Sequence, residues 1–227
     1  MNVLERLRGG VIVSVQANAD SVLNAPPTIA TLAQCAIANG AAGVRIEGSA
    51  RIAAVRAAID GPILGIIKRV HEGFEPYITS TIEEIAEAAL AGAHVVAFDA
   101  TERPRFGGAG IRASINEIRR RAKLAMADCS TEDDARDATE AGADIIATTL
   151  AGYTRETHGR ALPALDLVHR FSRFHPFVIC EGGVGDPASV AAAFAAGASA
   201  VVVGTALTNL DANVSRFVAA APRSGTR

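Results

Sequence analysis

The stretch AGADII at residues 141–146 decides the fold, because an alanine-rich helical pattern ends there at a glycine and an apolar run begins at once. The same succession recurs as NGAAGV at 39–44, AGAHVV at 91–96 and AGASAV at 196–201. Glycine suits the end of a helix, where the backbone needs a positive φ. Each stretch therefore predicts a helix that leads directly into a buried strand.

The segments between these stretches follow the same alternation. It predicts strands near residues 11–15, 43–46, 63–67, 94–98, 124–127, 144–148, 177–180 and 200–204. It predicts helices near residues 28–39, 49–58, 81–91, 110–121, 131–141, 163–173, 187–196 and 211–220. The strands are almost continuous apolar runs, which is typical of parallel strands buried on both faces. Eight such units favour an α/β protein with a closed TIM (β/α)8 barrel, and an open doubly wound sheet is the alternative.

Three of the predicted helices have start signals. Thr81 with Glu84 and Thr131 with Asp134 have the spacing of a capping box. Pro187 follows an aspartate as proline follows an N-cap. These signals support the predicted helix positions.

Length and cysteine usage bound the domain organisation and the compartment. The 227 residues fit one barrel domain over residues 1–227, with residues 222–227 as a frayed tail. Cys35, Cys129 and Cys180 are an odd number at wide spacing, and we expect all three to be buried free thiols. The lack of a disulfide framework indicates a reducing compartment, so a cytoplasmic location is predicted.

Charge and hydropathy exclude several classes of partner. The formal net charge is −2 without a block of like charge, which argues against nucleic acid and against a polybasic membrane anchor. The uncharged residues 187–210 could span a bilayer by length, but Gly197 divides them into a helical pattern and a β-branched run. The apolar stretch near the N-terminus is too short for a signal peptide. A small anionic metabolite is the expected partner, and a homodimer stays open.

Charged side chains follow the predicted strands at their carboxyl ends. Lys68 closes the third predicted strand, and Glu181 closes the seventh. Arg45 and Asp128 occupy corresponding places in the second and after the fifth. Because ligands of α/β sheets bind at the carboxyl ends of the strands, we expect these side chains to share one site.

The loops after the last two strands predict a phosphate site. Gly182 and Gly183 follow the seventh strand, and Gly204 and Thr205 follow the eighth. In a barrel, backbone N–H groups of these loops and the start of a short helix form an anion nest, which glycine lets the oxygens approach. A tight turn without a ligand is the alternative.

With these residues in view, the chain resembles the N-acetylmannosamine-6-phosphate 2-epimerases, the phosphosugar epimerases of bacterial sialic acid catabolism. The resemblance covers nearly the whole chain. It rests on short blocks in the right order: VIVSVQA at 11–17, GVRIEG at 43–48, GIIKR at 65–69, DAT at 99–101, MAD at 126–128, TTL at 148–150, GYT at 152–154, EG at 181–182, VVG at 202–204 and RF at 216–217.

The resemblance implies a phosphate-binding TIM barrel that interconverts N-acetylmannosamine 6-phosphate and N-acetylglucosamine 6-phosphate without a metal or another cofactor. Lys68 matches the catalytic lysine of the family, and Glu181 matches the glutamate of its catalytic site. Gln16, Arg45 and Asp128 match positions that contact the substrate. The glycines after strands seven and eight match the phosphate cradle.

Two positions depart from the family pattern. Gly183 stands where relatives often carry Asn, Arg or Lys, and Asn209 stands where an arginine is common. The second departure puts in doubt any phosphate or sugar contact that such an arginine makes.

The residues themselves suit this chemistry. A 2-epimerase removes a proton from the carbon beside the anomeric centre, which is acidic only when the ring is open. Neutral Lys68 qualifies as the base if desolvation and Arg45 or Arg69 lower its pKa. Glu181 is then the partner for ring opening or for the opposite face of C2, and one-base and two-base mechanisms both stay open. The enolate oxygen needs donors such as Arg45.

Two other functions remain as alternatives. A Schiff-base aldolase or lyase acting on a phosphorylated sugar or sugar acid would use Lys68 as a nucleophile in the same barrel. A non-catalytic phosphosugar-binding module is disfavoured, because binding alone would need neither Lys68 nor Glu181.

The charged candidates could also have purely structural roles. Lys68 and Glu181 could form a simple ion pair. Arg45 could pair with Glu47 or Asp128 at the rim.

Structural roles are also open to Asp99, Tyr153 and His71. Asp99 is expected to cap the following turn or bind Arg103. Tyr153 is either a substrate-contacting lid or a packing residue, and His71 could face the substrate. The histidines lack metal-ligand spacing, so no metal site is predicted.

Overall fold

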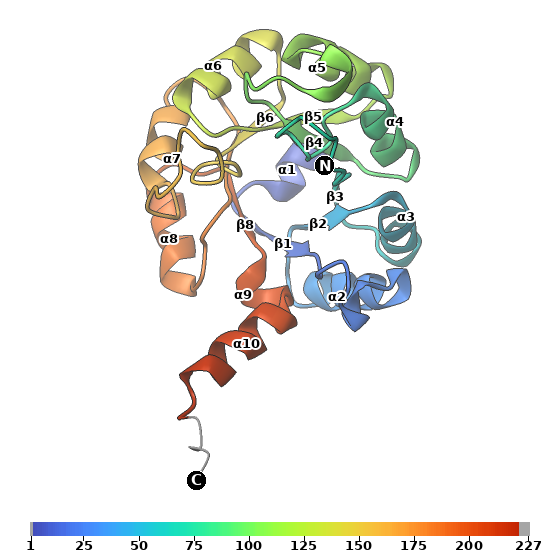
Figure 1. The fold of residues 1–227 in the computed structure, drawn as a ribbon, viewed down its shortest axis with the longest axis vertical. Helices are drawn as coiled ribbons and strands as arrows, with labels where there is room; N and C mark the ends of the chain where they lie inside the picture. Colours follow the sequence, from blue (N-terminus) through green and yellow to red (C-terminus); the bar gives the residue numbers. More distant parts are fainter. Residues whose placement is uncertain (1, 223–227) are drawn as a thin grey trace.

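The computed structural model describes residues 2–222 and shows, within them, eight parallel strands closed into a barrel (Figure 1). Each strand pairs with the next along the chain, and the last pairs with the first. The TIM-barrel prediction is confirmed, and the open sheet is excluded. Of the predicted tail, residues 223–227 lie outside the described residues. The strands are β1 (Val11–Val15), β2 (Gly43–Glu47), β3 (Ile63–Ile66), β4 (Val95–Asp99), β5 (Leu124–Asp128), β6 (Ile145–Ala147), β7 (Val178–Cys180) and β8 (Ala200–Val203).

Helices surround the barrel at the predicted places. The capping boxes at Thr81 and Thr131 form, and Pro187 occupies the first turn of its helix. The glycine that ends the helix in each of the four repeated stretches has a φ between 93° and 109°, as its position requires. The predicted helices are α2 (Pro26–Ala38), α3 (Ser49–Ala58), α4 (Ile82–Leu90), α5 (Ile111–Arg120), α6 (Glu132–Ala141), α7 (Leu165–Phe171), α8 (Pro187–Ala195) and α10 (Leu210–Ala220).

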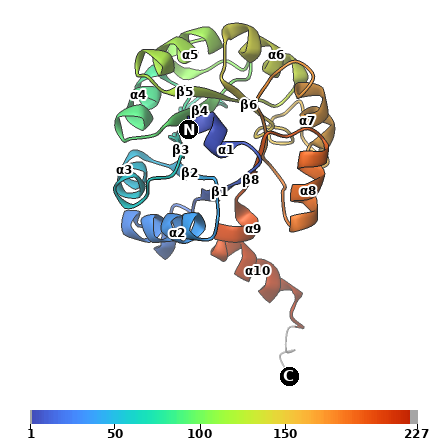
Figure 2. The ribbon, with the colours of Figure 1, turned by 180° about the vertical axis from the view of Figure 1, so that it is seen from behind.

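Four short helical segments were not predicted individually. They are α1 (Val3–Leu7), α9 (Thr205–Thr208) and two 3₁₀ turns, η1 (Val22–Asn24) and η2 (Phe106–Gly108). Segments this short show no helical period in a sequence. Seen from behind, α1 lies across the end of the barrel where the strands begin (Figure 2), and its Leu7 joins the cluster of apolar side chains inside the barrel.

The alternation of side chains along the strands explains how the charged residues meet. Inside the barrel lies an apolar cluster that includes Ile12, Leu64, Met126, Ile179 and Val202. Their neighbours along each strand face the helices and form the larger core. Because side chains alternate with a period of two, residues an even number of positions beyond the interior ones also face inward. Lys68, Asp128 and Glu181 all have this spacing, so their strands direct them to the barrel axis.

The last helix leaves the body of the molecule. Figure 1 shows α10 pointing away from the barrel, and none of its described residues is buried. Its apolar residues Leu210, Val214 and Phe217 are 56%, 50% and 71% exposed. Within residues 2–222, no helix combines the length and apolar character that a bilayer crossing requires.

The burial of the cysteines is a partial correction. Cys129 and Cys180 are buried as predicted, but Cys35 is exposed. Helix α2 buries Ile29 and Ala33, and Cys35, two residues beyond Ala33, lies on the opposite side of the helix.

Candidate active site

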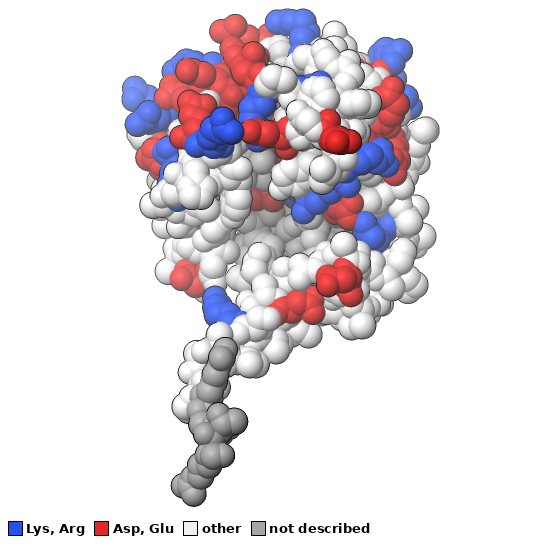
Figure 3. Space-filling view, in the orientation of Figure 1, with Lys and Arg blue, Asp and Glu red and all other residues white. Residues whose placement is uncertain are grey.

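A cavity of about 440 Å³ opens at the carboxyl ends of the strands. Figure 3 shows the hollow at the centre of this face. Nine of the ten predicted site residues line it: Gln16, Arg45, Lys68, Tyr153, Glu181, Gly182, Gly183, Gly204 and Thr205. The tenth, Asp128, is fully buried beneath them.

A second cavity, of about 560 Å³, lies among the loops after β3 to β6 and contains none of the predicted residues. Its Arg103 pairs with Glu75 and Asp99, and its Asp134 caps helix α6. These side chains already have structural partners. The smaller cavity is therefore the candidate active site.

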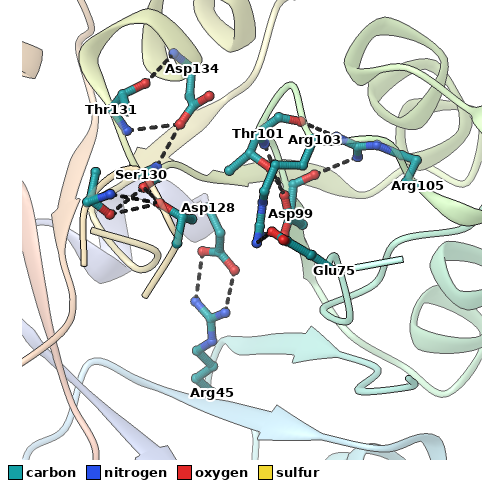
Figure 4. A network of polar contacts seen from close by, with 12 residues as sticks. Arg45, Glu75, Asp99, Thr101, Arg103, Arg105, Asp128, Ser130, Thr131 and Asp134 are labelled. Atoms are coloured by element: carbon teal, nitrogen blue, oxygen red, sulfur yellow. Dashed lines mark hydrogen bonds and ion pairs between the residues drawn. The ribbon is translucent and has the colours of Figure 1, made fainter. Parts of the chain in front are cut away.

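Arg45 connects two carboxylates at the floor of the site. Its guanidinium donates from Nη1 to Asp128 Oδ1 at 3.1 Å and from Nη2 to Asp128 Oδ2 at 2.5 Å, the two-pronged contact shown in Figure 4. Nη1 also donates to Glu181 Oε2 at 2.6 Å. Among the described residues, the buried Nε of Arg45 has no hydrogen-bond partner. Burial alone would lower the pKa of Arg45, but the two carboxylates outweigh it and raise that pKa.

Glu181 holds its proton more tightly than an ordinary glutamate. Burial is the largest cause and raises its pKa to about 7, and the negative charge of Asp128 acts in the same direction. Arg45 opposes both effects, but one guanidinium shared between two carboxylates does not fully neutralise the pair. The backbone of Glu181 is fixed from β6, because its N–H donates to Thr148 Oγ1 at 3.1 Å. Near neutral pH this carboxyl group can therefore both give and take a proton.

Lys68 reaches the same cavity from β3. Desolvation lowers the pKa of Lys68, and the nearby positive charge of Arg45 lowers it further. Because water reaches the exposed side chain through the open mouth, the lowering is smaller than a sealed pocket would cause. Lys68 forms no ion pair within residues 2–222, since Glu181 pairs with Arg45 instead. The simple Lys68–Glu181 ion pair is therefore not what the structure shows.

A hairpin fixes the backbone at Lys68. The residue forms an isolated antiparallel bridge with Ile78, and the N–H of Thr79 donates to the carbonyl of Ile67 at 2.7 Å. This return of the chain brings Tyr77 to the wall of the cavity. The backbone at Lys68 is thus fixed both by strand β3, which precedes it, and by the loop that follows it.

Asp128 acts from below the cavity. It is fully buried, and Thr149 Oγ1 donates to its Oδ1 at 2.6 Å in addition to the contacts from Arg45. The structure thus shows Asp128 holding Arg45 and Thr149, whereas its predicted contact with a substrate stays a prediction.

The glycine-rich end of the cavity has backbone groups without partners. The N–H groups of Gly182 and Gly183 donate to no other backbone or side-chain group among the described residues. Gly182 and Gly183 have φ of 104° and 70°, and a Cβ at Gly183 would lie 2.3 Å from Leu162 Cβ. Glycine is therefore required at 183 by packing as well as by conformation.

The contacts of Asp99 and His71 give both residues structural roles. Asp99 accepts from Thr101 and from Arg103, at 2.7 Å in the latter case, as predicted. His71 does not line the cavity but contacts Glu84 at 2.8 Å and stacks on Phe106. Neither side chain is therefore part of the candidate active site.

Tyr153 lines the cavity and is 61% exposed, which leaves its predicted substrate contact open. Among the described residues, no group of three or more His, Cys, Asp or Glu side chains is arranged to hold a metal ion.

The sequence reasoning missed several residues of the cavity wall. Ser14 and Thr149 could have been found, because they share the inward spacing of Gln16 and Glu181. Tyr77 and the residues contributed by α9 and α10 could not, since their positions depend on how a loop and a helix leave the barrel. The missed residues include Ser14, Tyr77, Thr149, Thr208, Asn213 and Arg216, whereas Asn209, singled out above as a departure from the family pattern, also lines the cavity.

Comparisons with known proteins agree with one another. The family model "Putative N-acetylmannosamine-6-phosphate epimerase", NanE, matches residues 29–223. A "Putative N-acetylmannosamine-6-phosphate 2-epimerase" of Synechococcus elongatus is 42% identical over 221 residues, which cover 96% of this chain and 95% of that protein. The solved structure of the N-acetylmannosamine-6-phosphate 2-epimerase from Clostridium perfringens has a TM-score of 0.92 at 32% identity and covers 96% of both chains.

Other relatives are longer. The "Bifunctional enzyme NanE/NanK" of Brucella melitensis biotype 1 is 45% identical over 206 residues, which cover 91% of this chain. The match spans only 39% of the bifunctional protein.

Proposed function

The chain belongs to the N-acetylmannosamine-6-phosphate epimerase family, and on this basis we propose that it interconverts N-acetylmannosamine 6-phosphate and N-acetylglucosamine 6-phosphate. The reaction would serve the catabolism of sialic acid and other amino sugars. One observation carries the proposal: a lysine with a lowered pKa and a carboxyl group with a raised pKa open onto one cavity.

The proposed chemistry begins when the sugar ring opens and C1 becomes a carbonyl. Neutral Lys68 takes the C2 proton, and the electron pair of the broken C–H bond moves toward the C1 oxygen. That oxygen gains negative charge and needs a donor, for which the Nε–H of Arg45 has no competing partner among the described residues. Returning a proton to the other face of C2 gives the epimer.

The topology favours two separate bases for the two faces of C2. Strands β3 and β7 are four places apart in a ring of eight, so they form opposite walls of the barrel. Lys68 and Glu181 therefore approach the bound sugar from opposite sides. In this assignment protonated Glu181 supplies the proton on its own side, and Lys68 supplies it in the reverse reaction.

The phosphate is proposed to bind at the glycine-rich end. Gly182, Gly183, Gly204 and Thr205 line that part of the cavity. The unpaired N–H groups after β7 support the assignment, because an anion satisfies such donors. Gln16 and Tyr153 are assigned to the sugar, and Asp128 to holding Arg45 in place.

Proton NMR of N-acetylmannosamine 6-phosphate incubated with the protein, with nothing else added, tests the proposal. We expect resonances of N-acetylglucosamine 6-phosphate to grow to an equilibrium mixture. A Schiff-base lyase would instead cleave the sugar and form an adduct at Lys68 that borohydride traps. Unchanged sugar, or trapping with cleavage, would reject the epimerase.

We also propose that this barrel domain acts in the cytoplasm as a homodimer. The exposed apolar face of α10, formed by Leu210, Val214 and Phe217, supports a second copy as its partner. A helix that extends from the barrel with such a face gains stability by burying it. Light scattering should give twice the chain mass, and Phe217→Asp should reduce it to a monomer.

A further inference from the structure

Helix α10 has two different faces. Asn209, at its N-cap, and Asn213 and Arg216 are spaced by four and three residues, so they lie on one face, and all three line the candidate active site. The apolar residues described above lie on another face and point to solvent. The polar face of α10 is therefore part of the cavity wall.

The start of α10 is fixed beside the glycine-rich end of this cavity. Asn213 Nδ2 donates to the carbonyl oxygen of Thr205 at 2.8 Å. Asn209 Oδ1 accepts from the N–H of Ala212 at 2.9 Å and so caps the helix. Its side-chain carbonyl oxygen is thus occupied within the chain. Arg216 lies one helical turn beyond Asn213 and faces the same side.

Among the described residues that line the cavity, one positively charged side chain is free to bind an anion at the glycine-rich end. Arg45, Lys68, Glu181 and Arg216 are the charged residues among those that line it. Arg45 is held by two carboxylates, and Lys68 stands on the β3 wall with a lowered pKa. Arg216 lines the cavity and forms no ion pair with any residue in the range 2–222. Its guanidinium carbon is 5.5 Å from the centroid of the neighbouring Phe217 ring, a contact that leaves its N–H donors without a carboxylate partner among these residues.

We propose that Arg216 binds the phosphate group of the substrate and so makes the enzyme select phosphorylated sugars. The inference rests on the proposed function, because it assumes the substrate enters with its phosphate toward the glycine-rich end. The guanidinium can place two parallel N–H donors on two phosphate oxygens, while the backbone N–H groups of Gly182 and Gly183 bind the others. The position of α10 then determines the affinity for phosphate.

Binding of inorganic phosphate, followed by ³¹P NMR titration, tests this without catalysis. Arg216→Ala should weaken phosphate binding about 10- to 100-fold, the range expected for losing hydrogen bonds to a charged group. Arg216→Lys should lie between wild type and Arg216→Ala, since it keeps the charge and loses the fork. The matched control is Arg173→Ala, which removes the same charge from an exposed arginine that lines neither cavity.

Enzyme kinetics distinguish the role of Arg216 from the proposed function. If both hold, Arg216→Ala raises KM for N-acetylmannosamine 6-phosphate by a similar factor, whereas the control Arg173→Ala leaves KM at the wild-type value. Equal phosphate binding by wild type and Arg216→Ala, or no binding by wild type, would overturn the role of Arg216. A wild-type protein that binds phosphate through Arg216 but does not epimerise the phosphosugar would reject the proposed function alone.

Discussion

Replacing Glu181 by glutamine should stabilise the protein at high pH while it impairs catalysis. The folded protein raises the pKa of Glu181 from an ordinary 4.5 to about 7, chiefly by burial. The folded state therefore binds this proton more tightly than the unfolded chain does. The resulting contribution to stability is complete below about pH 4.5 and is lost as the pH rises through about 7.

The size of the effect follows from the same two values. A pKa raised from 4.5 to about 7 corresponds to about 3 kcal/mol. At pH 8, where Glu181 is ionised, the free energy of unfolding is lower by this amount. The neutral amide of Glu181→Gln avoids this cost and can still accept a hydrogen bond from Arg45. For a chain of 227 residues, 3 kcal/mol raises the melting temperature by about 6 to 12 °C.

Thermal unfolding of the wild type and of Glu181→Gln at pH 5 and pH 8 measures this difference in stability. We expect a large positive difference in melting temperature at pH 8 and a small one at pH 5, where Glu181 is mostly protonated. Glu156→Gln, at an exposed glutamate, should show neither. A Glu181→Gln variant with the same difference at both pH values, or one that is less stable at pH 8, would refute the reasoning.

Three further predictions concern the floor, the loop and the substrate. Asp128→Asn should lower the free energy of unfolding by about 3 to 5 kcal/mol, because it leaves the buried Arg45 without its main charged partner. Chemical denaturation measures this loss, and a loss below about 1 kcal/mol would contradict the prediction. Gly183→Ala should unfold at a lower temperature than Gly159→Ala. Both glycines have a positive φ, but only at position 183 does the added methyl group lie 2.3 Å from Leu162 Cβ. Equal melting temperatures for the two variants would exclude the packing argument. Unphosphorylated N-acetylmannosamine should be a very poor substrate in a comparison of kcat/KM, because it lacks the group that the glycine-rich end binds, and comparable values would exclude that role.

The barrel and the convergence of Lys68 and Glu181 were predictable because both follow from local patterns. Glycine at helix ends and near-continuous apolar strands marked the strand–helix units. Lys68 and Glu181 stood out because charges interrupt those runs at the carboxyl ends, where a closed barrel brings the strand ends together. The inward direction of both side chains follows from the period of two along a strand.

The remaining features depend on contacts between distant segments. Asp128 has the same sequence position relative to its strand as the others, yet Arg45 and Thr149 cover it, which only the assembled floor reveals. Tyr77 reaches the cavity through a hairpin closed at Lys68. Arg216 reaches it because α10 starts beside the loop after β8, a direction that helical periodicity does not encode.

Deuterium incorporation at C2 of the sugar phosphate, followed by proton NMR in heavy water, tests the assignment of Lys68 as the base most directly. The wild-type protein should exchange the C2 proton as it forms the epimer. Lys68→Ala should lose this exchange by at least about 100-fold while it still binds the phosphosugar. Exchange at the wild-type rate in Lys68→Ala would contradict the account.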